Sequence, residues 1–174
     1  NLNMKKGLFI LITGLPGVGK TTIGRELRKL MRLKYNPTIQ FNGEDLRKYF
    51  NLKGWSRKER IEISKKYTQI IKFLVDQKIN VILSCVVLFN EFHKNNERQI
   101  KNYFEIVLKS KLSNLKKIRK NLYIKKEKAW TIDLFPEYPK KPNMIIHNNH
   151  KKTQKQIAKK IMTQVLKQYE KNNS

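Results

Sequence analysis

Apolar residues occur along this chain in short continuous blocks, separated by longer stretches in which they recur every three or four positions. A short block without polar alternation is typical of a parallel strand that is buried on both faces. The blocks therefore predict strands, at residues 8–13, 38–42, within 80–89, at 103–109 and at 143–147.

The stretches between the blocks have the spacing of amphipathic helices. A first helix is predicted at residues 21–33. Further helices are predicted at residues 92–102, at 113–119 with Ser113 as the cap, and at 153–169. Strands that alternate with helices usually form a parallel sheet with right-handed connections. The pattern predicts an α/β fold, a three-layer sandwich in which helices cover both faces of a mainly parallel five-stranded sheet.

The longest helix is expected from residue 56 to about residue 77. Ser56 is followed three residues later by Glu59, which is the arrangement of a capping box at a helix N-terminus. The inner side of this helix is predicted to consist of Ile63, Tyr67, Ile70 and Leu74.

The chain length and the cysteine content indicate the domain number and the cellular compartment. The 174 residues fit a single domain, and no apolar run approaches the ~20 residues that span a bilayer. The apolar N-terminal stretch continues into a glycine-rich loop, unlike a signal peptide. The one cysteine, Cys85, lies in an apolar block and has no partner for an internal disulfide, which favours a reducing compartment. We expect a cytoplasmic protein that does not associate with membranes.

The net charge of +26 by itself suggests a nucleic-acid partner. However, 31 of the 39 basic residues are lysine, and 17 asparagines and 19 isoleucines accompany them, a composition typical of an A/T-rich genome. The lysines also spread over nearly the whole chain and form no arginine-rich helix. Nucleic-acid binding is therefore the less favoured interpretation, although a positive field would attract anionic nucleotides.

A phosphate-binding loop follows the first predicted strand. The sequence G-L-P-G-V-G-K-T at residues 14–21 satisfies the pattern G-x-x-x-x-G-K-[ST], with a buried strand before it and an amphipathic helix after it. Glycines let the backbone curl so that successive N–H groups point at phosphates, and the helix N-terminus adds its dipole. The residues predicted to bind the phosphates of ATP are Gly14, Leu15, Pro16, Gly17, Val18, Gly19, Lys20, Thr21 and Thr22.

Two residues of this loop have predicted chemical roles. Lys20 is expected to reach the β- and γ-phosphates, and the Thr21 hydroxyl is expected to bind Mg²⁺. A GTPase would carry the guanine-reading motif N-K-x-D, which does not occur here. A mechanical ATPase would usually have an acidic strand end where this chain has Ser84 and Cys85. These features favour a compact kinase for a small molecule.

Residues after the second strand are candidates for the acceptor side. Glu44 and Asp45 form an acidic corner, where a carboxylate can accept the proton of an acceptor hydroxyl or help to hold Mg²⁺. Arg47 and Arg60 can bind an anionic acceptor through bidentate contacts, and Trp55 offers a flat face to a base. In the alternative interpretation, Arg47 is a solvated helix residue and Trp55 only packs against the following helix.

From the phosphate loop to about residue 148, the chain resembles the adenylylsulfate kinase family. The family's D-G-D-N-x-R box corresponds to N-G-E-D-L-R at residues 42–47, and its G-F-S-x-x-D-R-x-E-N to G-W-S-R-K-E-R-I-E-I at residues 54–63. Its V-S-F-I-S-P-Y segment corresponds to residues 83–89, and its lid motifs to residues 121–126 and 130–137. Several weak matches in the same order are more specific than any one of them.

The resemblance implies a kinase that phosphorylates the ribose 3′-hydroxyl of a nucleotide with an activated 5′ group. Lys20, Glu44 and Asp45 would be its catalytic residues, and residues 120–141 would form a lid. The two tryptophans would enclose the base, and the two arginines would bind the anionic group. The positions that would bind the acceptor are Arg47, Trp55, Arg60, Ser84, Lys125 and Trp130.

The departures from the family pattern lie on the acceptor side. Asn42 and Glu44 replace the two aspartates of the box, Ile63 replaces an asparagine, and Val87 replaces a serine. An asparagine is not a base at neutral pH, so that role falls to Glu44 or Asp45. An unchanged ATP side with an altered acceptor side suggests a different nucleotide, and cytidine diphosphoramidate of bacterial capsule assembly is slightly favoured over adenylyl sulfate.

Two other hypotheses stay open. One is a kinase for a different small molecule, with a shikimate-, gluconate- or nucleoside-type acceptor. The other is an ATP-dependent nucleic-acid-binding or regulatory module that uses the basic surface. The sequence does not determine the oligomeric state, and a homodimer is one option.

Overall fold

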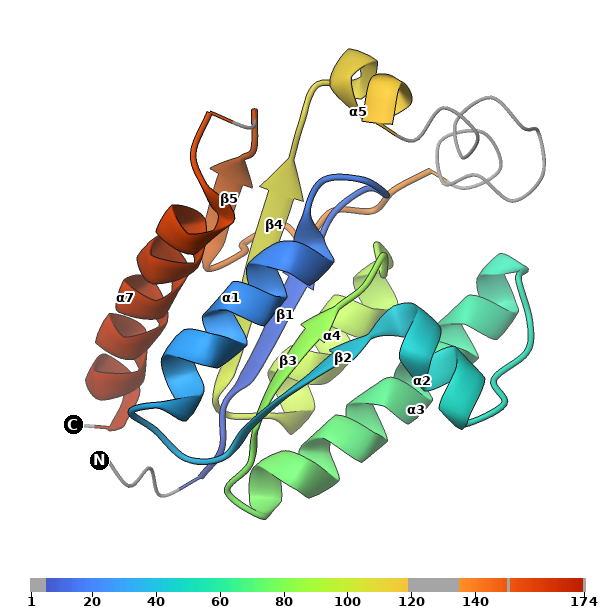
Figure 1. Ribbon diagram of the computed structural model, residues 1–174. Helices are drawn as coiled ribbons and strands as arrows, with labels where there is room; N and C mark the ends of the chain where they lie inside the picture. Colours follow the sequence, from blue (N-terminus) through green and yellow to red (C-terminus); the bar gives the residue numbers. More distant parts are fainter. Residues whose placement is uncertain (1–5, 119–134, 150, 174) are drawn as a thin grey trace.

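The computed structural model describes residues 6–118, 135–149 and 151–173. In this part of the chain, parallel strands form one five-stranded sheet in the order β2-β3-β1-β4-β5 (Figure 1). The strands are β1 (Phe9–Thr13), β2 (Thr38–Asn42), β3 (Asn80–Ser84), β4 (Tyr103–Lys109) and β5 (Met144–His147). β1 is the central strand, so the loop that follows it lies in the middle of the sheet edge.

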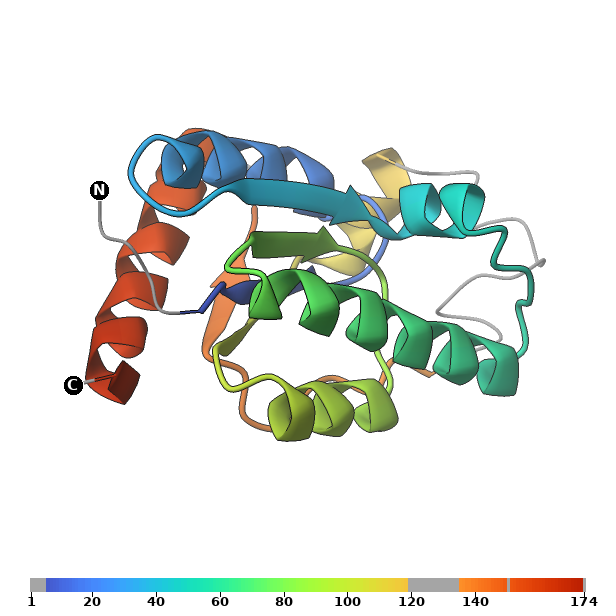
Figure 2. The same cartoon turned by 90° about the horizontal axis from the view of Figure 1, so that it is seen from below.

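Helices cover both faces of this sheet (Figure 2). α1 and α7 pack on one face, and α3 and α4 pack on the other. The helices are α1 (Lys20–Arg32), α2 (Gly43–Tyr49), α3 (Arg57–Asp76), α4 (Asn90–Gln99), α5 (Leu112–Ile118) and α7 (Gln154–Asn173). The predicted three-layer α/β sandwich is confirmed.

Alternation along the central strand divides the core into two apolar clusters. Ile10 and Ile12 of β1 belong to the cluster under α1 and α7, whereas Phe9 and Leu11 belong to the cluster under α3 and α4. Successive side chains of a strand point to opposite faces, so a strand covered on both faces is apolar at every position. This is why β1 appears in the sequence as a continuous apolar block.

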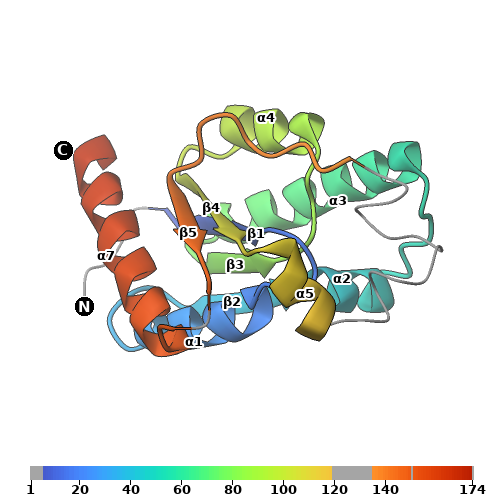
Figure 3. The same ribbon diagram turned by 90° about the horizontal axis from the view of Figure 1, so that it is seen from above.

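The carboxyl ends of the parallel strands share one edge of the sheet, onto which Figure 3 looks. α2 begins at the residue after β2, and the loop of residues 14–19 connects β1 to α1 at the same edge. Ligands of open α/β sheets bind at this edge. The fold therefore brings the phosphate loop and the acidic corner to the same end of the molecule.

The third apolar block is longer than the strand that it contains. The apolar block at residues 80–89 contains a strong strand signal, and β3 ends within it, at Ser84. Val87, Leu88 and Phe89 leave the sheet and stay buried in the cluster under α3 and α4, where the Val87 carbonyl accepts a hydrogen bond from Thr13. The apolar pattern continues past the end of the strand because a buried loop and a buried strand have the same apolar pattern.

The helix predictions need corrections. α2, with Glu44 and Asp45 in its first turn, was not predicted as a helix, since seven residues give little periodicity. α5 begins at Leu112, so Ser113 lies inside it and does not cap it. No helix in the described ranges is long and apolar enough to cross a membrane.

The capping box of the longest helix is confirmed. The Ser56 hydroxyl accepts a hydrogen bond from the Glu59 N–H, and the Glu59 carboxylate accepts one from the Ser56 N–H. The predicted inner side was only half right, because Ile70 and Leu74 are half-buried. The residues that α3 buries include Ile63, Tyr67, Ile71 and Val75, which continue from Tyr67 at spacings of four.

Candidate active site

The phosphate loop has the backbone conformation that its glycines permit. Gly14, Gly17 and Gly19 have φ values of 143°, 82° and 97°, in the region that side chains rarely adopt. At Gly14, an added Cβ would lie 2.3 Å from the carbonyl oxygen of Leu108 in β4. Only glycine therefore allows the loop to turn this closely over the neighbouring strand.

Lys20 lies across this loop. Its ammonium donates hydrogen bonds to the carbonyl oxygens of Gly14 and Leu15, both at 2.9 Å, and the side chain is buried. The positive charge is thus held on the curled backbone at the N-terminus of α1, where anions are favoured. A phosphate that bound there would meet the backbone N–H groups, the helix terminus and Lys20 together.

Hydrogen bonds connect the loop to the next two strands. The Ser84 hydroxyl at the end of β3 donates to the Lys20 carbonyl at 3.2 Å. The Gln40 amide of β2 donates to the Thr21 carbonyl at 3.1 Å and to the Ser84 hydroxyl at 3.3 Å. Gly24 leaves room for this pair, since its added Cβ would lie 2.5 Å from the Ser84 oxygen. Ser84 therefore supports α1, and its predicted contact with the acceptor stays a prediction.

Asn148 holds the loop from its other side. It follows β5 and is buried, and its side-chain amide donates to the Val18 carbonyl at 3.0 Å. Its own backbone N–H donates to the Lys109 carbonyl at 2.8 Å, which places it at the end of β4. The sequence reasoning missed Asn148, although a polar residue directly after a parallel strand is a signal that could have indicated it.

The acidic corner is built by the end of β2 and the first turn of α2. The Asn42 side-chain amide donates to the Asp45 carboxylate at 2.7 Å, and Gln40 donates to Asn42 at 3.5 Å. Because Gln40 also contacts Thr21, this chain of hydrogen bonds connects Asp45 to the phosphate loop. Glu44, the neighbouring candidate, is exposed. The geometry thus gives Asp45 the more fixed position of the two predicted carboxylates.

These residues fit a magnesium ion that is held mainly by substrate phosphates. Mg²⁺ prefers oxygen ligands and usually retains several waters, with only one or two ligands from the protein. The Thr21 hydroxyl and the Asp45 carboxylate carry oxygen atoms of this kind. Among the described residues, no group of three or more His, Cys, Asp or Glu side chains forms a metal cage.

Two arginines lie against Trp55 on the acceptor side. The guanidinium carbons of Arg47 and Arg60 are 4.4 Å and 5.2 Å from the centre of the indole ring. Arg47 donates to the carbonyls of Leu52 and Gly54, and Arg60 donates to the Trp55 carbonyl at 2.7 Å. These bonds fix the turn between α2 and α3, and Trp55 remains 49% exposed.

The electrostatics of this cluster favour an anion. Burial lowers the pKa of Arg60, and the nearby positive charge of Arg47 lowers it further. Two guanidinium groups that repel each other bind a phosphate-like group strongly, since it relieves the repulsion and accepts several hydrogen bonds. The fold thus brings together the predicted residues Arg47, Trp55 and Arg60.

Buried titratable groups below the cluster stay in their neutral forms. Burial raises the pKa of Cys85 to about 12, although Lys20 lowers it in part. Burial also raises the pKa of Tyr67 to about 12, and its hydroxyl donates to the Gly43 carbonyl. Cys85 is therefore an apolar filler, as its place in the sequence indicated. The remaining predicted residues, Lys125 and Trp130, and residues 120–134 of the predicted lid lie outside the described residues.

The family follows from a comparison with known proteins. A family model described as "Adenylylsulphate kinase" matches residues 6–147, which include the phosphate loop, the acidic corner and the arginine cluster. The chain belongs to the adenylylsulphate kinase family. It is a kinase with the nucleotide-binding loop of that family.

Individual relatives of this family member differ in the acceptor that they are named for. The cytidine diphosphoramidate kinase of Campylobacter jejuni is 38% identical over 124 residues, which are 70% of this chain and 73% of that protein. The adenylyl-sulfate kinase of Halothermothrix orenii is 24% identical over 166 residues, 91% of this chain and 89% of that protein. These likenesses favour a nucleotide kinase over the shikimate- or gluconate-type and nucleic-acid hypotheses.

A solved structure has the same fold. The adenylylsulphate kinase CysC of Mycobacterium tuberculosis, in complex with AMPPNP and APS, has a TM-score of 0.80 with this chain at 19% identity. The match covers 92% of this chain and 98% of CysC. It shows that this family member shares the fold of that kinase.

Proposed function

We propose that this chain transfers the γ-phosphoryl group of ATP to the ribose 3′-hydroxyl of cytidine diphosphoramidate. The proposal deepens the family assignment by naming the acceptor. It is supported by the 38% identity to a cytidine diphosphoramidate kinase, against 24% to an adenylyl-sulfate kinase.

The observation that carries the proposal is the cluster of Arg47, Trp55 and Arg60. The two guanidinium groups lie within 5.2 Å of the ring centre of Trp55, so an anionic group and an aromatic base can be bound side by side. A nucleotide with a charged diphosphate-type group has both features. A sugar acid such as gluconate has the anionic group but lacks the base.

The acceptor-side departures support a changed acceptor. Ile63, where the family pattern has asparagine, is buried in the apolar cluster under α3 and α4. Val87, where the pattern has serine, is buried in the same cluster. Both changes remove a polar side chain from the acceptor half, whereas the ATP half keeps its complete motif.

The described residues support an in-line transfer. Lys20 would neutralise the charge that develops on the β- and γ-phosphates, and Asp45 or Glu44 would accept the proton of the 3′-hydroxyl. The hydroxyl oxygen forms a bond to the γ-phosphorus as the bond to the β-phosphate oxygen breaks, and ADP leaves. Mg²⁺, when bound by Thr21 and the phosphates, would supply further neutralisation of charge.

A substrate panel tests the acceptor. Purified protein is incubated with ATP and Mg²⁺ and with cytidine diphosphoramidate, adenylyl sulfate, CDP or gluconate, and the product is identified by ³¹P NMR. We expect a 3′-phosphorylated cytidine product, which Lys20→Ala should abolish without loss of the folded circular-dichroism spectrum. Efficient turnover of adenylyl sulfate with none of the cytidine nucleotide would refute the proposed acceptor.

Two substitutions test the binding residues. Trp55→Ala should raise the acceptor KM by about tenfold, because stacking of a base on an aromatic ring contributes roughly 1–3 kcal/mol. Trp55→Phe keeps an aromatic face and should cost much less. Leu33→Ala, at an exposed apolar residue beyond α1, is the matched control. An unchanged acceptor KM in Trp55→Ala would remove Trp55 from the site.

A further inference from the structure

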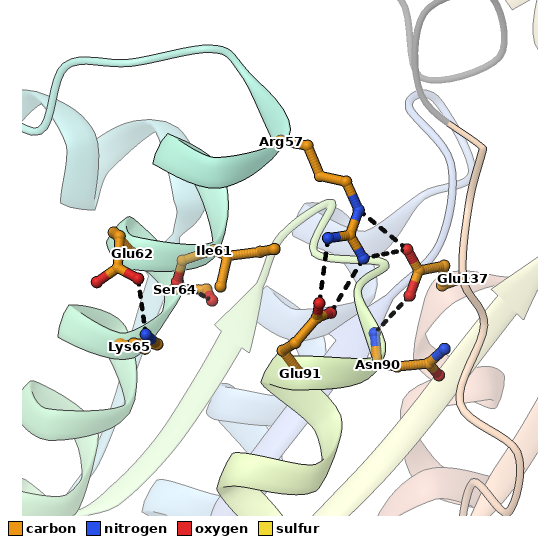
Figure 4. A network of polar contacts seen from close by, with 8 residues as sticks. All are labelled: Arg57, Ile61, Glu62, Ser64, Lys65, Asn90, Glu91 and Glu137. Atoms are coloured by element: carbon orange, nitrogen blue, oxygen red, sulfur yellow. Dashed lines mark hydrogen bonds and ion pairs between the residues drawn. The ribbon is translucent and has the colours of Figure 1, made fainter.

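A polar cluster lies beside the acceptor residues and was not anticipated from the sequence. It consists of Arg57, the first residue of α3, Glu91 in the first turn of α4, and Glu137, which precedes β5 (Figure 4). We call these three residues the Arg57 clamp. Glu91 and Glu137 are 34 and 80 residues from Arg57 in sequence, so only the tertiary structure brings them together.

The guanidinium of Arg57 binds both carboxylates with all three of its nitrogens. It donates to the two oxygens of Glu91 at 3.1 and 3.2 Å, and to one oxygen of Glu137 through Nε at 3.2 Å and Nη2 at 2.5 Å. Its central carbon also lies 5.6 Å from the ring centre of Phe89. A planar guanidinium is suited to this geometry, whereas a lysine ammonium presents a single point charge.

Glu137 connects the clamp to the loop after β3. Its second carboxylate oxygen accepts from the backbone N–H of Asn90, the first residue of α4, at 3.1 Å. Its own N–H donates to the Leu88 carbonyl at 2.9 Å. Burial opposes ionisation of Glu137, but the bonds from Arg57 and Asn90 outweigh it and keep the pKa of the carboxyl below its usual value. The chain at residue 137 is therefore fixed to the starts of two helices.

The exposure of the clamp argues against a purely stabilising role. The side chains of Arg57, Glu91 and Glu137 are 45%, 46% and 28% exposed, and ion pairs at such positions contribute little to the free energy of folding. The clamp does fix position, because it spans α3, α4 and the segment before β5. Arg57 directly follows Ser56 and lies two residues from Trp55, so the orientation of the α3 start determines where Trp55 and Arg60 lie.

We propose that Arg57 is a positioning residue for the acceptor half of the active site, held by Glu91 and Glu137. This inference rests on the proposed function, since it assumes that Trp55 and Arg60 bind the acceptor nucleotide. The phosphate loop is supported by other residues, namely Gln40, Ser84 and Asn148. The clamp therefore affects the binding of the acceptor and leaves the binding of ATP unchanged.

Arg57→Gln and a matched control separate this role from general destabilisation. The control is Lys72→Gln, which removes another exposed ion pair of α3, with Lys72 and Asp76 43% and 41% exposed. Steady-state kinetics with ATP and the acceptor are measured for each protein. We expect Arg57→Gln to raise the acceptor KM about fivefold, the size of one exposed charge-assisted contact, with the ATP KM and kcat within about twofold of wild type. Lys72→Gln should change neither KM.

Two further variants test the geometry of the clamp. Arg57→Lys keeps the positive charge but loses the planar guanidinium that contacts both carboxylates. Its acceptor KM should therefore lie between those of wild type and Arg57→Gln. Arg57→Glu combined with Glu91→Arg retains one arginine and two glutamates at the three positions, and it should recover part of the acceptor affinity that Arg57→Glu loses. A double variant that binds acceptor no better than Arg57→Glu would contradict a role that depends on this charge pairing.

The outcomes distinguish the two proposals. A wild-type protein that transfers phosphate to no nucleotide refutes the proposed function, and this inference with it. An active wild type whose acceptor KM is unaffected by Arg57→Gln overturns the clamp alone. A rise of the same size in both KM values also overturns it, because a general loss of structure would then explain the effect.

Discussion

Asn148→Ala tests whether the end of β5 holds the phosphate loop in place. The substitution removes the amide that donates to the Val18 carbonyl at 3.0 Å, at a site where both residues are buried. The carbonyl is then left without this donor, and a buried unsatisfied polar group costs roughly 1–3 kcal/mol. For a chain of this length, about 2–4 °C of Tm is lost per kcal/mol, so the Tm should fall by roughly 2–12 °C.

The same change should weaken the binding of ATP. Val18 and Gly19 are part of the loop that is expected to surround the phosphates, and Gly19 lies against Asn148, with its added Cβ 3.0 Å from the Asn148 amide nitrogen. A loop that must be reordered on binding loses affinity, so the ATP KM should rise severalfold while the acceptor KM changes little. Thermal unfolding followed by circular dichroism and steady-state kinetics measure the two effects.

The neighbouring asparagine provides the control. Asn149 is exposed and accepts a hydrogen bond from the Lys151 N–H at 3.2 Å, so Asn149→Ala should alter stability by no more than about 0.5 kcal/mol. If Asn148→Ala had the same Tm and ATP KM as Asn149→Ala, the bond from Asn148 to Val18 would have no role in holding the loop.

Two further predictions concern titratable groups. Hydrogen bonds from the Ser56 side chain and from the backbone N–H groups of Ser56 and Trp55 lower the pKa of Glu59 below 4.5. Its stabilising effect is therefore present above that pH and lost as the pH falls through the lowered value. Glu59→Gln should be less stable than wild type at pH 7, and the difference should shrink as the pH falls through that value. A constant difference in urea midpoint from pH 7 to 3 would be inconsistent with this. Burial raises the pKa of Cys85 to about 12. Iodoacetamide at pH 8 should therefore modify the thiol in 6 M guanidinium chloride but not in the native protein. Rapid modification of the native protein, detected by mass spectrometry, would contradict the burial of this thiol.

The sequence by itself determined the features that depend on neighbouring residues. The boundaries of β2 and β4 were predicted to the residue. β4 is buried over most of its length and therefore appears in the sequence as a mostly apolar block. The capping box of Ser56 and Glu59 and the phosphate loop were likewise readable, since every group they require lies within a few positions. The same locality limits the prediction, because the apolar pattern of residues 85–89 does not record that the chain has left the sheet.

The tertiary structure alone decided which of these features meet. Asn148 supports Val18 across 130 positions of sequence, and Arg57 pairs with Glu137 across 80. Neither pair leaves a periodic signal, because periodicity reports whether a residue is buried and does not report its partner. The sequence predicted a P-loop kinase and the residue types of its acceptor site. The order of the strands decided that Asp45 connects to Thr21 through Asn42 and Gln40, because parallel strands bring their carboxyl ends to one edge whatever their separation along the chain.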